Sequence, residues 1–121
     1  LNGAIFNNAR FSNTDLSNTS AEWAWFNTTD LTSANLDAAN LKRAYLTRTN
    51  FNNCSLRKTS LYRAEIVEAS FLNSSFDSVL VYDADWIINF KTRNVEGLVG
   101  FEENNLILEG KNNSENWIIP R

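Results

Sequence analysis

The 121-residue chain contains no histidine, no methionine and a single cysteine, Cys54. One cysteine excludes a disulfide within the chain, and the absence of histidine excludes the usual Cys/His zinc sites and most histidine-dependent catalysis. There is no apolar run long enough to span a bilayer, and no charged-then-apolar signal segment opens the chain. With 11 basic and 14 acidic residues, the net charge of −3 is too small to indicate a nucleic-acid-binding protein.

The residue pattern also gives no support to catalysis. Serines and threonines are abundant, but no base accompanies them, and we expect the scattered carboxylates to be solvated. There is no glycine-rich loop of the kind that cradles phosphate groups. We therefore expect no catalytic residues, no cofactor and no metal site, and we predict that the chain is not an enzyme. Because it begins at Leu1 and lacks methionine, we also expect an excised domain or a processed chain.

The abundant feature is a large apolar residue at every fifth position. Residues 29–46 show it most plainly, as TDLTSANLDAANLKRAYL, in which one similar triplet follows another every five residues. From Leu1 to Trp86 every fifth residue, here called a centre, is large and apolar except Ala21. The residue two places before each centre is never larger than valine. A short fixed period of this kind is typical of repeat architectures.

A period of five matches neither of the regular backbone structures. Helical side chains return to one face every 3.6 residues, and strand side chains alternate with a period of two. If the chain turns a corner once per repeat, every centre can point inward, and the small residue can point inward at the corner. The other three positions then face water, which explains why they are mostly polar. The pattern predicts a coil stacked upon itself.

The triplets TDL, ANL, ANL and AYL resemble the motif of the pentapeptide-repeat family: a small residue, then Asp or Asn, then Leu or Phe, then two variable positions. The resemblance covers residues 1 to about 88. It implies an all-β fold, a right-handed quadrilateral β-helix of about 4.5 coils with four repeats per turn. Twenty-residue spacing of alanine supports four repeats per turn, at Ala4, Ala24, Ala44, Ala64 and Ala84. Cys54 then occupies an inward slot, as a buried small residue rather than a reactive thiol.

The pattern fails after Trp86, where Asn89 and Lys91 would occupy inward slots. Buried polar side chains without partners are costly, so we expect the coil to end or distort there. We divide the chain into a β-helix, 1–88, and an irregular C-terminal cap or a connection to a following domain, 89–121. Short strands are expected around LVGF (98–101) and NLILEG (105–110), with WIIP (117–120) packed back or leading onward.

Twenty-residue stacking turns the outward positions into vertical ladders. Residues 41–63 hold six basic residues and no acidic one, whereas residues 64–85 hold five acidic residues and no basic one. One coil is therefore a basic belt and the next is acidic. We expect Arg48 to pair with Glu68, and Arg57 to lie between two aspartates, Asp37 and Asp77; exposed pairs of this kind contribute about 0.2–1 kcal/mol each.

Two neighbouring ladders place aromatic and basic side chains together. One runs Gly3, Trp23, Arg43, Arg63 and Asp83, and the other runs Ile5, Trp25, Tyr45, Glu65 and Asp85. Three interpretations are open: the indoles stack over Arg43 and its neighbours, Trp23 folds inward to fill the space left by Ala21, or the cluster is a binding surface. The candidate protein-binding residues, here called the corner surface, are Trp23, Trp25, Lys42, Arg43, Tyr45, Tyr62 and Arg63.

We predict a non-catalytic scaffold or protein-interaction module with a protein partner, either alone or as part of a larger bacterial protein such as an effector. The expected location is the cytoplasm or, after delivery, a host cytosol. The resemblance also implies an alternative, because some family members mimic DNA and shield DNA gyrase from inhibitors. That mimicry calls for a long acidic rod, and this one is short with a basic belt. A nucleic-acid partner is not expected, although basic and aromatic residues gather in the belt.

Overall fold

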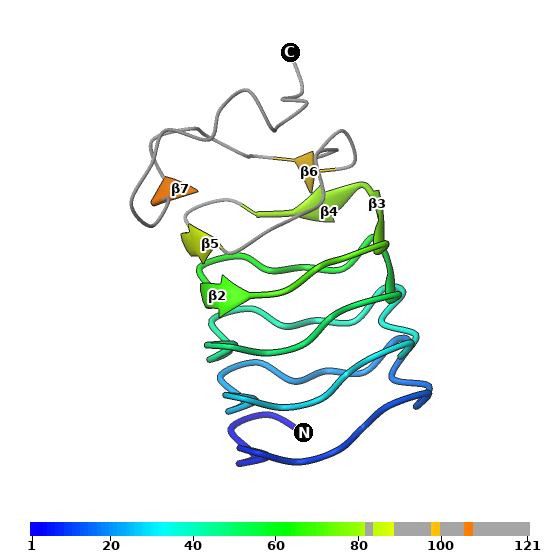
Figure 1. Cartoon of the computed structure of the whole chain (residues 1–121), viewed down its shortest axis with the longest axis vertical. Helices are drawn as coiled ribbons and strands as arrows, with labels where there is room; N and C mark the ends of the chain where they lie inside the picture. Colours follow the sequence, from blue (N-terminus) through cyan, green and yellow to red (C-terminus); the bar gives the residue numbers. More distant parts are fainter. Residues whose placement is uncertain (82–83, 89–97, 100–105, 108–121) are drawn as a thin grey trace.

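A computed structural model describes residues 1–81, 84–88, 98–99 and 106–107 of the chain. The chain forms coils stacked along one axis, with the N-terminus at one end of the stack (Figure 1). Parallel β-bridges join residues twenty positions apart, as in Ile5 to Trp25, Trp25 to Tyr45, and Tyr45 to Glu65. One coil therefore takes twenty residues, which is four pentapeptides, as the alanine spacing predicted.

Each pentapeptide contains one tight turn, and the turn begins at the centre. The backbone N–H of the small residue donates to the carbonyl oxygen of the preceding centre, as Ala44 does to Leu41 at 3.1 Å. The third residue of each turn has positive φ, 57° at Arg43 and 61° at Trp23, the sign that a type II turn requires. The corner thus lies between the two inward residues, and the small residue is the last of the turn.

Before residue 55 the described coils pair through isolated β-bridges, and short strands begin at residue 55. They are β1 (Ser55–Arg57), β2 (Glu65–Ala69), β3 (Ser75–Asp77), β4 (Val79–Leu80), β5 (Asp85–Ile88), β6 (Leu98–Val99) and β7 (Leu106–Ile107). All pair in parallel, in the groups β1–β3, β2–β5–β7 and β4–β6. Figure 1 shows β2, β5 and β7 one above another at the left of the stack, and β6 above β4 at the right.

The two short strands expected in the C-terminal part are present. β6 pairs with β4 in the register Val79 to Leu98, and β7 pairs with β5 in the register Trp86 to Leu106. The offset of 20 residues from Trp86 to Leu106 equals one coil, and the offset of 19 from Val79 to Leu98 is one residue shorter; both strands pair in parallel with the strand below. The expectations for Asn89, Lys91 and residues 117–120 lie outside the described residues, and the cap over 89–121 stays a prediction.

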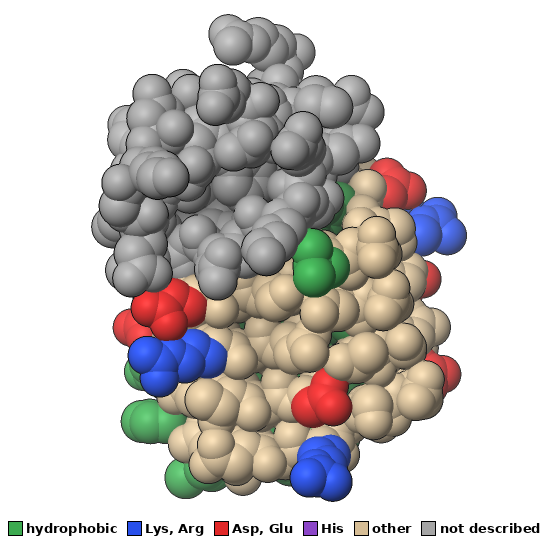
Figure 2. Space-filling view, in the orientation of Figure 1, with side chains coloured by type: hydrophobic (Ala, Val, Ile, Leu, Met, Phe, Trp, Pro, Cys, Tyr) green, Lys and Arg blue, Asp and Glu red, His purple; other side chains and the backbone are tan. Residues whose placement is uncertain are grey.

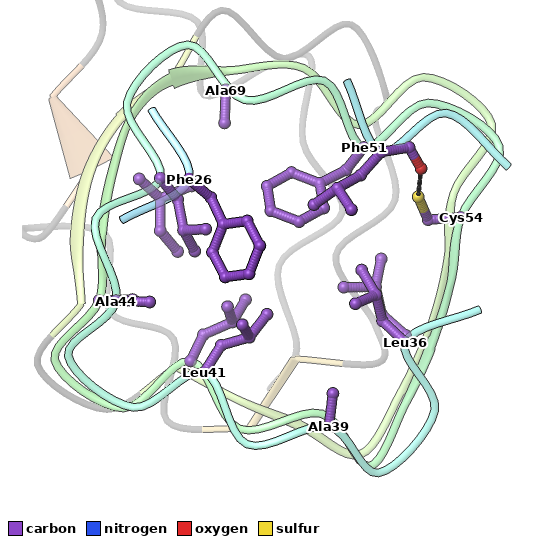
Figure 3. Close-up of a cluster of buried hydrophobic side chains, with 14 of the residues drawn as sticks. Phe26, Leu36, Ala39, Leu41, Ala44, Phe51, Cys54 and Ala69 are labelled. Atoms are coloured by element: carbon purple, nitrogen blue, oxygen red, sulfur yellow. Dashed lines mark hydrogen bonds between the residues drawn. The ribbon is translucent and has the colours of Figure 1, made fainter. Parts of the chain in front are cut away.

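The centres fill the interior of the stack, as predicted. Figure 3 shows Phe26, Leu36, Leu41 and Phe51 pointing into the enclosed space, with alanines at the edge of the coil. Phe71 stacks on Phe51 from the next coil, with ring centroids 4.7 Å apart and planes at 2°. The polar residues in small slots are also satisfied, because each donates to the carbonyl oxygen of the residue 23 positions earlier. These donors are Thr29, Thr49, Cys54, Thr59 and Ser74.

Side-chain ladders outside the coils reinforce the backbone pairing. An Asn or Asp directly after a centre accepts the backbone N–H of the residue twenty positions later, as Asn52 does from Leu72 at 2.9 Å. The expected ion pair Arg48–Glu68 is confirmed at 2.8 Å. Arg57 pairs with Asp77 at 3.4 Å, whereas the Asp37 carboxylate accepts the backbone N–H of Arg57.

The first coil is packed on one side only. Its centres Phe6, Phe11 and Leu16 are partly buried against the core, and Leu1 is 50% exposed. Ala21 leaves a cavity of about 10 Å³ lined by apolar side chains that include Leu1 and Leu41. The space that a larger side chain would fill at position 21 is therefore empty.

Candidate interaction surface

The corner surface forms where two ladders run on either side of one corner of the stack. Along the chain, Arg43, Ala44 and Tyr45 alternate outward, inward and outward, and Ala44 is fully buried. The same alternation repeats one coil below at residues 23–25 and one coil above at residues 63–65. The β-bridges from Trp25 through Tyr45 to Glu65 hold the outer residues in register. The backbone therefore fixes the positions of the Cβ atoms of these outward side chains.

Aromatic stacking organises the corner surface. The Arg43 guanidinium lies over the Trp23 ring at 5.0 Å from the centroid. The Trp25 and Tyr45 ring centroids are 4.5 Å apart. Such contacts restrict the side chains and stabilise the pair by about 0.5–1 kcal/mol at an exposed site. The stacking interpretation is therefore confirmed for both tryptophans.

The inward interpretation of Trp23 is wrong. Trp23 is 47% exposed and Trp25 is 41% exposed, and neither fills the space beside Ala21. Trp23 is the third residue of a turn with φ of 61°, and this position directs its side chain to the outside of the corner.

A shallow cleft of about 370 Å³ opens between the two ladders. It is lined by Trp23, Arg43, Tyr45, Arg63 and Glu65. Four of these residues belong to the predicted corner surface. Glu65 was not among the predicted site residues, although its place above Tyr45 followed from the twenty-residue register.

The other three predicted residues lie beside the cleft rather than in its lining. Trp25 supports the Tyr45 ring, and Tyr62 lies under the Arg63 guanidinium at 5.2 Å. Lys42 is exposed, and its backbone N–H donates to the Asn40 side chain.

The charge of the corner surface changes along the rod. At the left edge of Figure 2, hydrophobic, basic and acidic side chains follow one another from the N-terminal end upward. The residues of the two ladders have this order, from Trp23 and Trp25 through Arg43 to Glu65. Among the described residues, no carboxylate lies within 4.0 Å of the Arg43 guanidinium. The cleft thus combines an aromatic wall with a guanidinium that has no ion-pair partner in this part of the chain.

Other kinds of site find no support in the described part of the chain. It contains no group of three Cys, Asp or Glu side chains placed to hold a metal ion. It also contains no helix with the length and apolar character needed to cross a bilayer. Burial raises the pKa of the Cys54 thiol from 9.0 to about 11, so the thiolate is not formed near neutral pH.

The model of the family described as "Pentapeptide repeats" matches residues 1–32 and 34–73 in eight copies. The chain belongs to the pentapeptide-repeat family. All seven residues of the corner surface lie within the two matched ranges. A search of curated proteins found no match.

Solved pentapeptide-repeat structures resemble the chain in fold. A trypsin-treated variant of QnrB1, a plasmid-mediated fluoroquinolone resistance protein, aligns with a TM-score of 0.67 and 16% identity over 99% of this chain and 79% of that one. A second trypsin-treated variant of QnrB1 gives 0.64 and 18% identity over 88% and 69%. A pentapeptide-repeat protein of the Arabidopsis thaliana thylakoid lumen gives 0.45 and 25% identity over 72% of this chain. This chain spans 64% of the length of the Arabidopsis protein.

Proposed function

We propose that the chain is a non-catalytic scaffold that binds a protein partner through the corner surface. The observation that carries this proposal is the exposure of Trp23 and Trp25, at 47% and 41%, on a backbone held by inter-coil hydrogen bonds. Exposed aromatic and arginine side chains on a rigid support are the composition of binding hot spots. Stacking onto Arg43 and Tyr45 restricts the indoles before a partner arrives, which lowers the entropy lost on binding.

The remaining features of the proposal concern the whole chain. We propose a right-handed, four-sided β-helix of about 4.5 coils over residues 1–88, and a C-terminal cap over 89–121. As in the sequence-based prediction, the proposed setting is a larger bacterial protein such as an effector.

The test compares two variants of the 121-residue chain as baits. The first carries Trp23→Ala, Arg43→Gln and Tyr45→Ala; the second carries Lys58→Gln and Asn53→Ala on another side of the stack. Lys58 and Asn53 occupy the same turn position as Arg43, with φ of 58° and 60°, so backbone effects are matched. Quantitative mass spectrometry of captured proteins should show a partner that binds the wild type and the second variant but not the first. Equal capture by both variants would refute the corner surface.

The alternative function is DNA mimicry directed at DNA gyrase. The likeness to QnrB1 is at 16–18% identity and concerns the fold. The basic belt of residues 41–63 opposes this alternative, because a DNA mimic must present negative charge along its length. Gyrase supercoiling with and without the protein, in the presence of a fluoroquinolone, tests it. We expect no protection; protection that survives the corner variants would favour mimicry instead.

A further inference from the structure

We infer that the cleft of the corner surface binds an extended segment of a protein partner that places one carboxylate on Arg43 and an apolar side chain beside Trp23. This inference rests on the proposed role as an interaction module and specifies the chemistry of the partner. It depends on three features of the corner: the orientation of the Arg43 guanidinium, the open rung at Gly3, and the carboxylate of Glu65 at one end of the cleft.

Arg43 is arranged to receive a carboxylate. The Trp23 ring covers one face of its guanidinium at 5.0 Å, but the N–H donors lie in the plane of the group and point away from its faces. A stacked arginine can therefore still donate two parallel hydrogen bonds to one carboxylate. Within the described residues no carboxylate approaches this guanidinium within 4.0 Å. Its charge is half-buried beside the cleft, so an incoming anion would meet a cation that is already positioned.

The rung below Trp23 provides room for an apolar side chain. That rung is Gly3, and a Cβ placed there would have no heavy atom within 4 Å. On the neighbouring ladder Ile5 is 71% exposed below Trp25. A side chain from a partner can therefore occupy the space at Gly3 against Trp23 and Ile5. Adjacent rungs lie about 4.8 Å apart, so the positions of Gly3 and Arg43 are separated by about 9.6 Å. In an extended peptide, residues two positions apart lie on one face about 6.7 Å from each other, and the length of the Asp and Phe side chains spans the difference.

The flanking charges favour a peptide over a nucleic acid. Glu65 lines one end of the cleft, next to Arg43 and Arg63. A strand of nucleic acid carries a phosphate at every nucleotide and would meet this carboxylate beside Arg43. A peptide can place one carboxylate at Arg43 and neutral or basic groups elsewhere. The net charge of −3 also disfavours a polyanion.

The experiment uses fluorescein-labelled peptides of equal length and the full 121-residue chain, with fluorescence anisotropy at two salt concentrations. The first kind of peptide carries Asp and Phe two positions apart and is made in both orders. In the second kind Asp is replaced by Asn, and in the third kind Asp is replaced by Lys. An oligothymidylate of similar length is the nucleic-acid probe. We expect the Asp peptide to bind at least about tenfold more tightly than the Asn peptide, the effect of one charge-assisted contact.

Variants assign the binding to the cleft. Arg43→Gln should weaken the Asp peptide about tenfold, and Lys58→Gln, which removes one charge from the same turn position on another side, should leave it unchanged. Gly3→Asn places a polar side chain in the open rung at a positive φ of 67°, which Asn8 and Asn13 also adopt at the same turn position. It should weaken the aromatic peptide while the far-UV spectrum stays the same.

Three results would overturn the inference: no binding of the Asp peptide at about 1 mM, equal binding of Asp and Asn peptides, or tighter binding of oligothymidylate. Partner capture that depends on the corner surface while the Asp peptide fails would leave the proposed function intact and remove only this inference. Loss of that capture dependence would instead remove the proposed function itself.

Discussion

One ladder of the core contains the same residue in three successive coils and allows a matched test of the packing. Leu16, Leu36 and Leu56 occupy one inward position at twenty-residue spacing. Leu56 is 0% exposed and Leu36 is 1% exposed, because each has a coil on both sides. Leu16 belongs to the first coil and is only partly buried. Replacing each in turn by alanine removes the same atoms from different surroundings.

The expected cost follows from how completely each leucine is enclosed. Leu→Ala in a closed core destabilises a protein by about 2–5 kcal/mol, partly through the cavity that remains. We expect about 3 kcal/mol for Leu56→Ala, whose neighbours above and below are held by inter-coil hydrogen bonds. Leu16 loses contacts on one side only and leaves a gap open to water rather than a closed cavity. For Leu16→Ala we expect about half the cost, roughly 1–1.5 kcal/mol.

Leu36→Ala should cost at least as much as Leu56→Ala. Leu36 lines the existing cavity of about 10 Å³ beside Ala21, and removal of its side chain would enlarge that cavity. The penalty rises with the volume left empty, by about 24 cal/mol per Å³.

Urea unfolding monitored by far-UV circular dichroism measures all three variants. The dependence of the free energy of unfolding on urea should be unchanged, so the midpoints can be compared directly. An equal, large cost at Leu16 and Leu56 would refute the one-sided packing of the first coil. Costs below about 1 kcal/mol at both Leu36 and Leu56 would refute the closed interior itself.

Three further predictions concern single side chains. Cys54 should resist a thiol reagent at pH 8 in the folded chain and react in urea, because burial raises its pKa to about 11. Since the unfolded thiol has a pKa of 9.0, the free energy of unfolding should fall between about pH 9 and 11, and Cys54→Thr should remove this pH dependence. Hydrogen bonds from the Thr32 hydroxyl and backbone N–H lower the pKa of Asp30. The contribution of Asp30 to stability should therefore be present above pH 3.8 and lost as the pH falls further. In urea unfolding at several pH values, Asp30→Asn should reduce this dependence on acid. A double-mutant cycle with Trp23→Ala and Arg43→Gln should give a coupling of about 0.5–1 kcal/mol in urea unfolding, and zero coupling would contradict the stacked geometry.

The interior of the stack was predictable because it depends on one simple requirement. Each pentapeptide buries one large and one small side chain, so the spacing of apolar residues defines the core without any further information. The same spacing placed Cys54 in a small inward slot, and the twenty-residue register identified the pairs Arg48–Glu68 and Arg57–Asp77. The partners in these pairs are neighbours along a ladder, and each ladder follows from counting twenty residues along the sequence.

The corner surface was predictable only in part. Counting placed Trp23, Arg43 and Tyr45 near one another, but it left open whether Trp23 points into the core. The outward position of Trp23 depends on the turn, in which the third residue takes positive φ. The predicted site also lacked Glu65, because only aromatic and basic residues were chosen for it. Glu65 lines the cleft because its position in the stack places it above Tyr45.

The sequence by itself determined the repeat, the family and the inward residues, because every fifth residue is apolar; the family resemblance and the alanine spacing indicated a coil of twenty residues. The tertiary structure decided the direction of each outward side chain, the cleft between the two ladders and the one-sided packing of the first coil. These features arise from turn geometry and from contacts between coils twenty residues apart, and side chains at positions facing water are not constrained by the burial pattern.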